Sequence, residues 1–342
     1  MKIRSKAPLR LGLAGGGTDV SPYSDEFGGC VLNATINLFA NAYIDQEVNG
    51  NEVVFEAKDL GIREVIDLRK PFSIEGKLLL HRAVYIRVMR DFNHGHLLPL
   101  RIITESDAPP GSGLGSSSTM VVAILEGLKQ LLSLPLGEYD VAHLAYQIER
   151  NDCSLAGGKQ DQYAATFGGF NFIEFYKKDR VIVNPLRIRK NIINELEANL
   201  ILYYTGKSRH SAKIIDDQMK SIRGENIRRL EAMHNVKKSA FRIKEHLFKA
   251  NIEELSQEFK LAWEAKKATS SSIANPLIND IENCVLNCGA KSLKISGAGG
   301  GGFMMVFVEP ERRVEVIQQL KKFGGVIHKF QFTREGAYSW TI

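Results

Sequence analysis

The fold of this chain is decided by the stretch Pro109-Pro110-Gly111-Ser112-Gly113-Leu114-Gly115-Ser116-Ser117-Ser118-Thr119. An apolar run typical of a strand (residues 98–103) precedes it, and a run typical of a helix (residues 120–132) follows it. Glycines at alternate positions permit positive φ, so that successive backbone N–H groups can turn toward one point. Hydroxyls then stand where a helix begins and favours an anion. The stretch is therefore predicted to bind phosphate, because a Gly/Ser-rich linker would have polar flanks instead.

The composition is that of an ordinary globular protein, with 342 residues, 44% of them hydrophobic and 25% charged. This length supports a full core in two domains or one large one. The net charge of +6 is modest and no basic block is interleaved with aromatics, so we expect small anions rather than nucleic acid as partners. No apolar run reaches membrane-spanning length, and residues 1–6 lack the apolar segment of a secretory signal. We therefore expect a cytoplasmic monomer or homodimer with no membrane partner.

The familiar nucleotide-binding templates do not fit the glycine clusters at residues 15–17, 111–115 and 297–302. A Walker A loop needs Lys-Ser/Thr after its last glycine, and neither Gly115-Ser116-Ser117 nor Gly302-Phe303 supplies that pair. The Rossmann spacing fails because the glycines of the second cluster are two residues apart. The protein-kinase H-R-D and D-F-G elements are missing as well. A phosphate-binding loop of another class remains.

Three segments, in this order, closely resemble the motifs of the GHMP kinases, named for galactokinase, homoserine kinase, mevalonate kinase and phosphomevalonate kinase. They are Ala7-Pro8-Leu9-Arg10 with Gly15-Gly16-Gly17-Thr18-Asp19, then residues 109–118, then Lys294-Ile295-Ser296-Gly297-Ala298-Gly299-Gly300-Gly301-Gly302. The resemblance spans nearly the whole chain.

The resemblance implies an α+β fold of two domains with the active site between them. The N-terminal domain (residues 1–185) would be of the ribosomal-protein-S5-domain-2 type, with a left-handed β-α-β unit. The C-terminal domain (residues 186–342) would be ferredoxin-like with added helices, and residues 181–191 would form the hinge. Strand patterns followed by a helix-rich second half agree with an α+β class.

The resemblance also implies which residues hold ATP and Mg²⁺. The phosphates of ATP would lie on Pro110, Gly111, Ser112, Gly113, Leu114, Gly115, Ser116, Ser117 and Ser118. Ser117 and Glu149 match the magnesium ligands of the family. One hydroxyl and one carboxylate, with waters and phosphates completing an octahedron, suit Mg²⁺. The alternative for Glu149, which precedes Arg150, is a solvated helix face.

Asp161 and Arg10 are the catalytic candidates. Asp161 matches the carboxylate that serves as the base in the sugar kinases of the family, and Arg10 matches a cation near the base and the transferred phosphoryl group. Phosphoryl transfer needs charge on the γ-phosphate neutralised and the two oxygens in line, which these residue types can provide. The alternatives are a helix cap for Asp161 and an ordinary surface cation for Arg10.

The first motif narrows the choice among the sugar substrates of the family. Galactokinases carry Gly-Glu-His-x-Asp there, whereas this chain has Gly15-Gly16-Gly17-Thr18-Asp19 and keeps only the aspartate. The loop is similar to that of enzymes that phosphorylate the anomeric hydroxyl of D-glycero-D-manno-heptose 7-phosphate, giving the 1,7-bisphosphate for nucleotide-activated heptose. It is also similar to the kinase part of L-fucose-salvage enzymes. A chain of 342 residues, without an appended nucleotidyltransferase, favours the heptose phosphate.

The residues expected to contact this sugar phosphate are Asp19, Gly17, Thr18, Lys207, Arg209, Gly299 and Gly300. The two cations could bind a distal sugar phosphate, and a solvated helix start is an equally good interpretation of them. A fucokinase- or galactokinase-like sugar 1-kinase is the alternative activity. A non-catalytic sugar or nucleotide sensor is the alternative of another class, and it predicts a damaged base or metal ligand.

Overall fold

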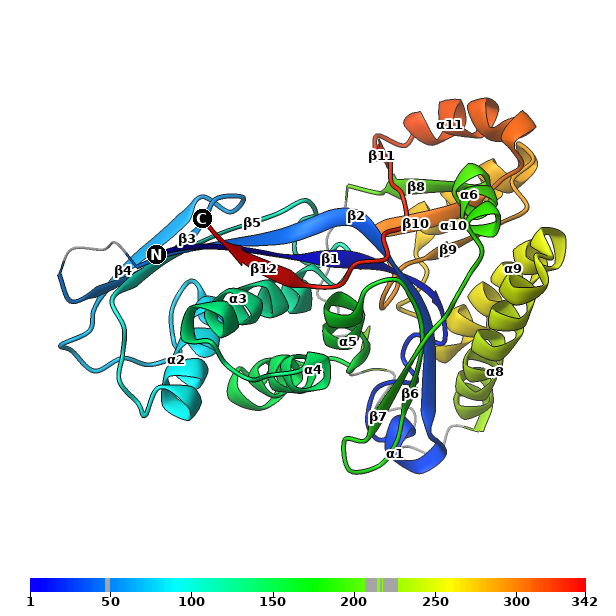
Figure 1. Cartoon of the computed structure of the whole chain (residues 1–342). Coiled ribbons are helices and arrows are strands. Elements are labelled where there is room, and N and C mark those ends of the chain that lie inside the picture. Colours follow the sequence, from blue (N-terminus) through cyan, green and yellow to red (C-terminus); the bar gives the residue numbers. More distant parts are fainter. Residues whose placement is uncertain (47–49, 207–213, 216, 218–226) are drawn as a thin grey trace.

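Two β-sheets and the helices around them make up the chain (Figure 1). The computed structural model describes residues 1–342 except 47–49, 207–213, 216 and 218–226. The strands of the first sheet are β1 Lys2–Ala14, β2 Gly29–Asp45, β3 Glu52–Ala57, β4 Ile62–Asp67, β5 Leu100–Ser106, β6 Phe170–Phe175, β7 Val181–Pro185 and β12 Tyr338–Thr341. Those of the second sheet are β8 Leu200–Tyr204, β9 Ser292–Ile295, β10 Phe303–Phe307 and β11 Val326–His328.

The helices named below are α1 Tyr23–Phe27, α2 Leu79–Phe92, α3 Ser116–Leu132, α4 Glu138–Gln147, α5 Gln160–Phe167, α6 Lys190–Asn199, α8 Ile227–Lys249, α9 Ile252–Thr269, α10 Pro276–Asn287 and α11 Arg313–Lys321. A π-helical turn, Ile148–Asp152, continues α4. The start of α10 shows how local chemistry sets these bounds. Asn275 accepts a hydrogen bond from Ile278 N at 3.0 Å, and proline occupies the first helical position.

The first sheet has the order β12-β1-β2-β5-β3-β4; β6 also pairs with β2, and β7 pairs with β6. One edge of the long strand β2 pairs with two strands in succession: residues 29–34 pair with β6, and residues 40–45 pair with β5. The sheet therefore splits, and β6 and β7 turn away from β5 (Figure 1). Strands β3 and β5 are parallel. The hand of the connection between them stays a prediction.

The second sheet has the order β11-β8-β10-β9 and its pairs are all antiparallel. In chain order this is fourth, first, third and second, the arrangement of a ferredoxin-like sheet. Helices α8, α9 and α10 lie between its first and second strands in the sequence. The predicted α+β fold is confirmed.

A shared apolar core joins the two sheets. Side chains of β1 and β2 pack in one cluster with those of the second sheet and of α9; among them are Leu9, Leu11, Leu32, Leu202, Phe259, Phe303 and Met305. Each such buried side chain contributes about 1.5–3 kcal/mol. The two units are therefore held together by packing, while α2, α3 and α4 cover the first sheet through a cluster of their own (Figure 1).

Some elements differ from the sequence-based expectation. The hinge expected at residues 181–191 contains β7 and the beginning of α6. The short helix α5 was not expected after Gly157-Gly158, and strand β12 returns to the first sheet, where Ile3 faces Thr341. The domain division at residues 185 and 186 stays a prediction, with the last strand lying in the first sheet.

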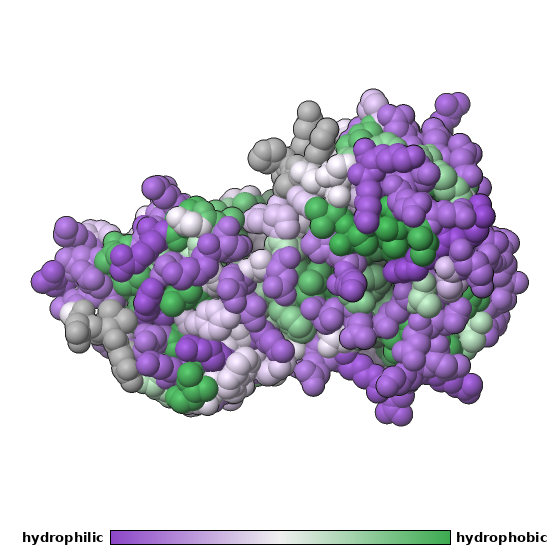
Figure 2. Space-filling model, turned by 90° about the horizontal axis from the view of Figure 1, so that it is seen from above, coloured by the Kyte–Doolittle hydropathy of each residue, from purple (hydrophilic) through white to green (hydrophobic). Residues whose placement is uncertain are grey.

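Hydrophilic side chains predominate at both ends of the face seen in Figure 2, and hydrophobic ones gather in its wider part. Within the described ranges, no helix is both long and apolar enough to cross a bilayer.

Candidate active site

The three glycine segments meet around one cavity of about 460 Å³. The third segment lies against the second at Gly302, where an added Cβ would lie 2.2 Å from the Ser112 carbonyl oxygen. A Cβ on Gly113 would lie 2.4 Å from the carbonyl oxygen of Ser296. The first motif is tied in by the amide of Arg10, which donates to the Leu114 carbonyl at 3.1 Å. Glycine is required because backbone touches backbone.

The phosphate-binding candidate is a loop between β5 and α3. Gly111, Gly113 and Gly115 have φ of 73°, 88° and 79°, and α3 begins immediately after them at Ser116. Most of the predicted loop residues line the cavity: Pro110, Gly111, Gly113, Gly115, Ser116, Ser117 and Ser118. Ser112 and Leu114 do not line it, since Leu114 belongs to the shared core and Ser112 is fully buried. The cavity thus borders a helix N-terminus, where an anion is favoured.

Asp161 and Arg10 form an ion pair within this cavity. Arg10 is 3% exposed, and its Nε donates to Asp161 Oδ1 at 2.7 Å while Nη2 lies 2.5 Å from the same oxygen. Its Nη1 donates to the Gly113 carbonyl at 2.6 Å, so Arg10 also touches the glycine loop. Asp161 lies in the first turn of α5 and lines the cavity. The alternative of an exposed surface cation at residue 10 is therefore wrong.

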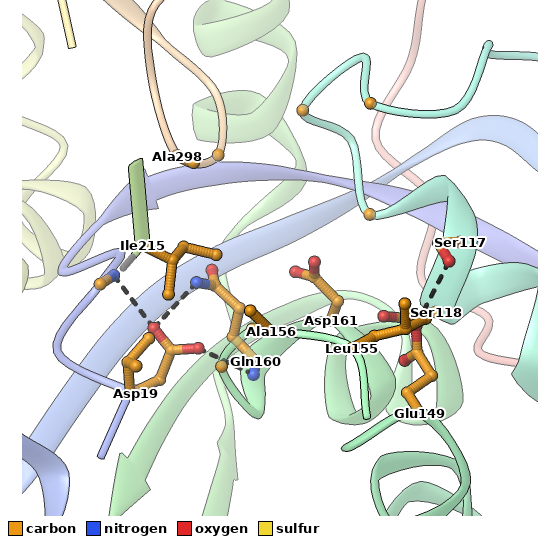
Figure 3. Close-up of a pocket in the computed structure, with 18 of the residues that line it drawn as sticks. Asp19, Ser117, Ser118, Glu149, Leu155, Ala156, Gln160, Asp161, Ile215 and Ala298 are labelled. Carbon is orange, nitrogen blue, oxygen red and sulfur yellow. Dashed lines mark hydrogen bonds between the residues drawn. The ribbon is translucent and has the colours of Figure 1, made fainter. Parts of the chain in front are cut away.

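Ser117 and Glu149 lie together at the other side of the cavity (Figure 3). Ser117 Oγ donates to Glu149 Oε1 at 3.3 Å. Glu149 is 1% exposed, which rules out the solvated helix face. Its second oxygen accepts a hydrogen bond from Gln162 Nε2, which also donates to Ser118 Oγ at 3.1 Å.

These two oxygens fit a magnesium ion. Two ligands at about 2.1 Å from an octahedral Mg²⁺ lie about 3 Å apart, close to the separation of Ser117 Oγ and Glu149 Oε1. No group of three or more His, Cys, Asp or Glu side chains suited to a metal occurs in the part of the chain that the structure describes. Two protein ligands with phosphates and waters are the usual arrangement for Mg²⁺ in nucleotide sites.

Asp19 is buried and its carboxylate accepts three hydrogen bonds. The donors are the amide of Gly17 at 3.0 Å, the amide of Gln160 at 3.1 Å and Gln160 Nε2 at 3.0 Å (Figure 3). A Cβ on Gly158 would lie 1.9 Å from Asp19 Oδ2. Asp19 and Gly17 line the cavity, whereas the hydroxyl of Thr18 donates to the Gly15 carbonyl at 2.8 Å and is fully buried. The first motif thus forms a rigid wall next to Asp161.

Two charged residues that line the cavity were not predicted from the sequence. Lys266 of α9 is 8% exposed, lines the cavity and donates to the Gly16 carbonyl at 2.7 Å. Burial lowers the pKa of Lys266 to about 8, and the charge of Asp19 opposes that shift. Arg150 also lines the cavity and donates to the Leu155 carbonyl at 3.2 Å. Neither lies in a glycine motif, and a lysine on an amphipathic helix gives no signal in one sequence.

The remaining predicted contacts lie elsewhere. Gly299 and Gly300 do not line the cavity, although their neighbours Gly297 and Ala298 do. The Gly300 amide donates to the Ile273 carbonyl at 2.6 Å. Lys207 and Arg209 fall outside the described residues, so their role stays a hypothesis.

Comparison with known proteins gives the same picture. Residues 79–169 match the model of the GHMP kinases N terminal domain, and residues 243–326 match GHMP kinases C terminal. The chain is 45% identical over 340 residues to a D-glycero-alpha-D-manno-heptose 7-phosphate kinase of Campylobacter jejuni, covering 99% of each. It is 24% identical to a bifunctional fucokinase/GDP-fucose pyrophosphorylase of Arabidopsis thaliana, spanning all of this chain and 32% of that protein.

A solved structure is similar over the whole length. It is the crystal structure of a D-glycero-D-manno-heptose 1-phosphate kinase from Bacteriodes thetaiotaomicron, with a TM-score of 0.83 and 43% identity over 99% of each chain.

Proposed function

We propose a reaction for this chain, which is a sugar kinase and belongs to the GHMP kinase family. In this reaction the γ-phosphoryl group of ATP is transferred to the anomeric hydroxyl of D-glycero-D-manno-heptose 7-phosphate. The observation that carries the proposal is the ion pair between the buried Arg10 and the partly buried Asp161, which faces the same cavity as the glycine loop and the Ser117–Glu149 pair. An acceptor hydroxyl beside Asp161 would lie between the base and the bound phosphates.

The chemistry follows from these contacts. Arg10 holds Asp161 through Oδ1, which leaves Oδ2 as the oxygen that can accept the sugar proton. Arg10 Nη1 donates to the Gly113 carbonyl at 2.6 Å and to Ser296 Oγ at 3.2 Å, so the guanidinium fixes the base relative to the phosphate loop. Mg²⁺, held by Ser117 and Glu149, would neutralise charge on the phosphates. Gln162 holds the second oxygen of Glu149 in place.

The choice of a heptose phosphate rests on the relatives. Two proteins more than 40% identical to this chain over its full length carry heptose phosphate kinase names. Those names differ in where they put the phosphate, position 7 in one and position 1 in the other, so the reacting hydroxyl is part of our proposal. The fucokinase relative is less similar, and its chain is much longer. An intact base and an intact metal-ligand pair also argue against a non-catalytic sensor.

The test is a substrate panel with Asp161→Asn as the matched variant. Wild-type protein with ATP and Mg²⁺ should release ADP with heptose 7-phosphate and form a product carrying phosphate at position 1, identified by ³¹P NMR. Loss of the base should lower kcat about 100-fold or more, since general base catalysis contributes at least that much, while ATP affinity stays within about twofold.

Two results would contradict the proposal. Efficient turnover of L-fucose or galactose, with none of heptose 7-phosphate, would overturn the substrate. An Asp161→Asn protein that keeps a tenth or more of the wild-type kcat would overturn the base assignment.

A further inference from the structure

Lys266 places a buried cation on the side of the cavity formed by the first glycine motif. It comes from α9 of the second unit and reaches the Gly16 carbonyl at 2.7 Å. An ammonium group carries three N–H donors, and this contact uses one of them. Across the described ranges of the chain, no carboxylate lies within the ion-pair distance of 4.0 Å from Lys266 Nζ. Asp19 acts on it only at longer range.

A second buried lysine shows what a purely structural role looks like here. Lys294 of β9 is 7% exposed and donates to the carbonyls of Gly12 at 2.8 Å and Leu13 at 2.5 Å. It does not line the cavity. Lys294 therefore donates to two backbone carbonyls, whereas Lys266 lines the cavity and donates to one carbonyl among the described residues. Holding a buried charge without a partner is costly unless a ligand supplies one.

The counter-charge cannot come from the wall next to Lys266. Asp19 already accepts three hydrogen bonds from Gly17 and Gln160 and is 1% exposed. Arg10, the nearest catalytic cation, is engaged by Asp161 and the glycine loop. Among the residues that the structure describes, no carboxylate is left to pair with Lys266, and the phosphate oxygens of a ligand in the cavity are acceptors that lysine binds well.

We propose that Lys266 binds the phosphate group that the acceptor sugar already carries, and thereby selects phosphorylated over free sugars. This inference rests on the proposed function. The acceptor rather than ATP is the favoured source, because Lys266 lies against the loop that contains Gly16, whereas the nucleotide has the amides after Pro110 and the Ser117–Glu149 pair. The γ-phosphate of ATP is the other source of the same chemistry.

Three variants separate these roles. Lys266→Met keeps the size of the side chain without its charge, Lys266→Arg keeps the charge, and Lys294→Met removes the matched lysine that does not line the cavity. Lys266→Met should raise KM for heptose 7-phosphate about 10- to 100-fold, the usual effect of losing a charge-assisted hydrogen bond, with KM for ATP within about twofold. Lys266→Arg should restore most of the affinity. Lys294→Met should lower Tm without changing KM for the sugar phosphate.

A pH profile gives a second readout. The pKa of Lys266 is near 8 because of burial, with Asp19 opposing the shift, and Lys294 and Arg10 are the neighbouring cations of the same network. Only the ammonium form binds phosphate, so sugar phosphate affinity should be full below pH 8 and fall as pH rises through it. Arginine stays charged, so Lys266→Arg should show no such fall.

The outcomes that overturn the inference are distinct from those that overturn the proposed function. An unchanged KM for the sugar phosphate in folded Lys266→Met, with a raised KM in Arg209→Ala, would assign the distal phosphate to Arg209. A raised KM for ATP alone would assign Lys266 to the nucleotide. If the wild type does not use heptose 7-phosphate, the proposed function fails. Calorimetry of inorganic phosphate binding to the wild type and Lys266→Met then decides the role of Lys266.

Discussion

At the scale of single residues, the site depends on two oxygens that are held in place before any ligand arrives. Ser117 Oγ lies 3.3 Å from Glu149 Oε1, and Gln162 holds the other oxygen of Glu149. In the proposed metal site, these two oxygens would hold Mg²⁺ in place of the hydrogen bond between them. The fold therefore positions both oxygens: the π-helical turn carries Glu149, and the start of α3 carries Ser117.

Removing the hydroxyl should weaken metal binding. Ser117→Ala should raise the Mg²⁺ concentration needed for half-maximal ATP binding about 10-fold or more, because even the loss of a residue that supports a metal ligand costs about 10- to 100-fold. Calorimetry of ATP binding at varied Mg²⁺ measures this. Ser116→Ala is the control, since its hydroxyl donates to the Pro109 carbonyl at 3.2 Å. Equal Mg²⁺ dependence in the two variants would remove Ser117 from the metal site.

At the scale of elements, the cavity is built from loops that touch through their backbones. Gly113 has a φ of 88°, and a Cβ there would lie 2.4 Å from the Ser296 carbonyl oxygen. The third glycine segment therefore buttresses the phosphate loop more than it contacts ligand. This explains why Gly299 and Gly300, predicted to bind substrate, do not line the cavity while Gly297 does.

A pair of alanine variants isolates this contact from simple backbone strain. Gly113→Ala should lower the free energy of unfolding by more than the ~1–2 kcal/mol that left-handed backbone costs alanine, because the added Cβ also forces two loops apart. Gly61 has a φ of 65° with open space around it, so Gly61→Ala should lower the free energy of unfolding only by the cost of left-handed backbone. Urea unfolding measures both. Equal losses would mean that the loops tolerate separation.

Much of the fold could be predicted from the sequence, because apolar runs differ clearly from the glycine-rich segments beside them. Strand β10 consists only of apolar residues, and the helix α3 follows a glycine loop, so both signals are local. The short helix α5 was not predicted, because its eight residues carry too few apolar positions to show a helical period. Lys266 was not predicted either, since its burial depends on a loop 250 residues away.

At the scale of the whole molecule, the last strand, β12, forms one edge of the first sheet. Strand β12 pairs with β1 in an antiparallel register from Ile3–Thr341 to Lys6–Tyr338, and the two termini lie near each other in Figure 1. Lys6 also lies over the Tyr338 ring at 5.1 Å. The second unit is thus inserted between strands of the first.

Removal of residues 338–342 should destabilise the first sheet selectively. Four facing pairs are lost, each worth about 0.2–1 kcal/mol, so the free energy of unfolding should fall by ~1–4 kcal/mol. Hydrogen exchange should accelerate at β1 amides that face β12, such as that of Arg4 opposite Trp340, and stay slow in β10. Trp340→Ala keeps the backbone ladder and should have a smaller effect. Uniform acceleration across both sheets would show that β12 stabilises the molecule as one cooperative body.

The pairing of β12 with β1 also sets an order on synthesis. Because β1 emerges from the ribosome first and β12 last, one edge of β1 stays without its partner until the second unit has been translated. An unpaired strand edge is prone to join another chain, so the nascent protein carries this exposed edge for most of its translation.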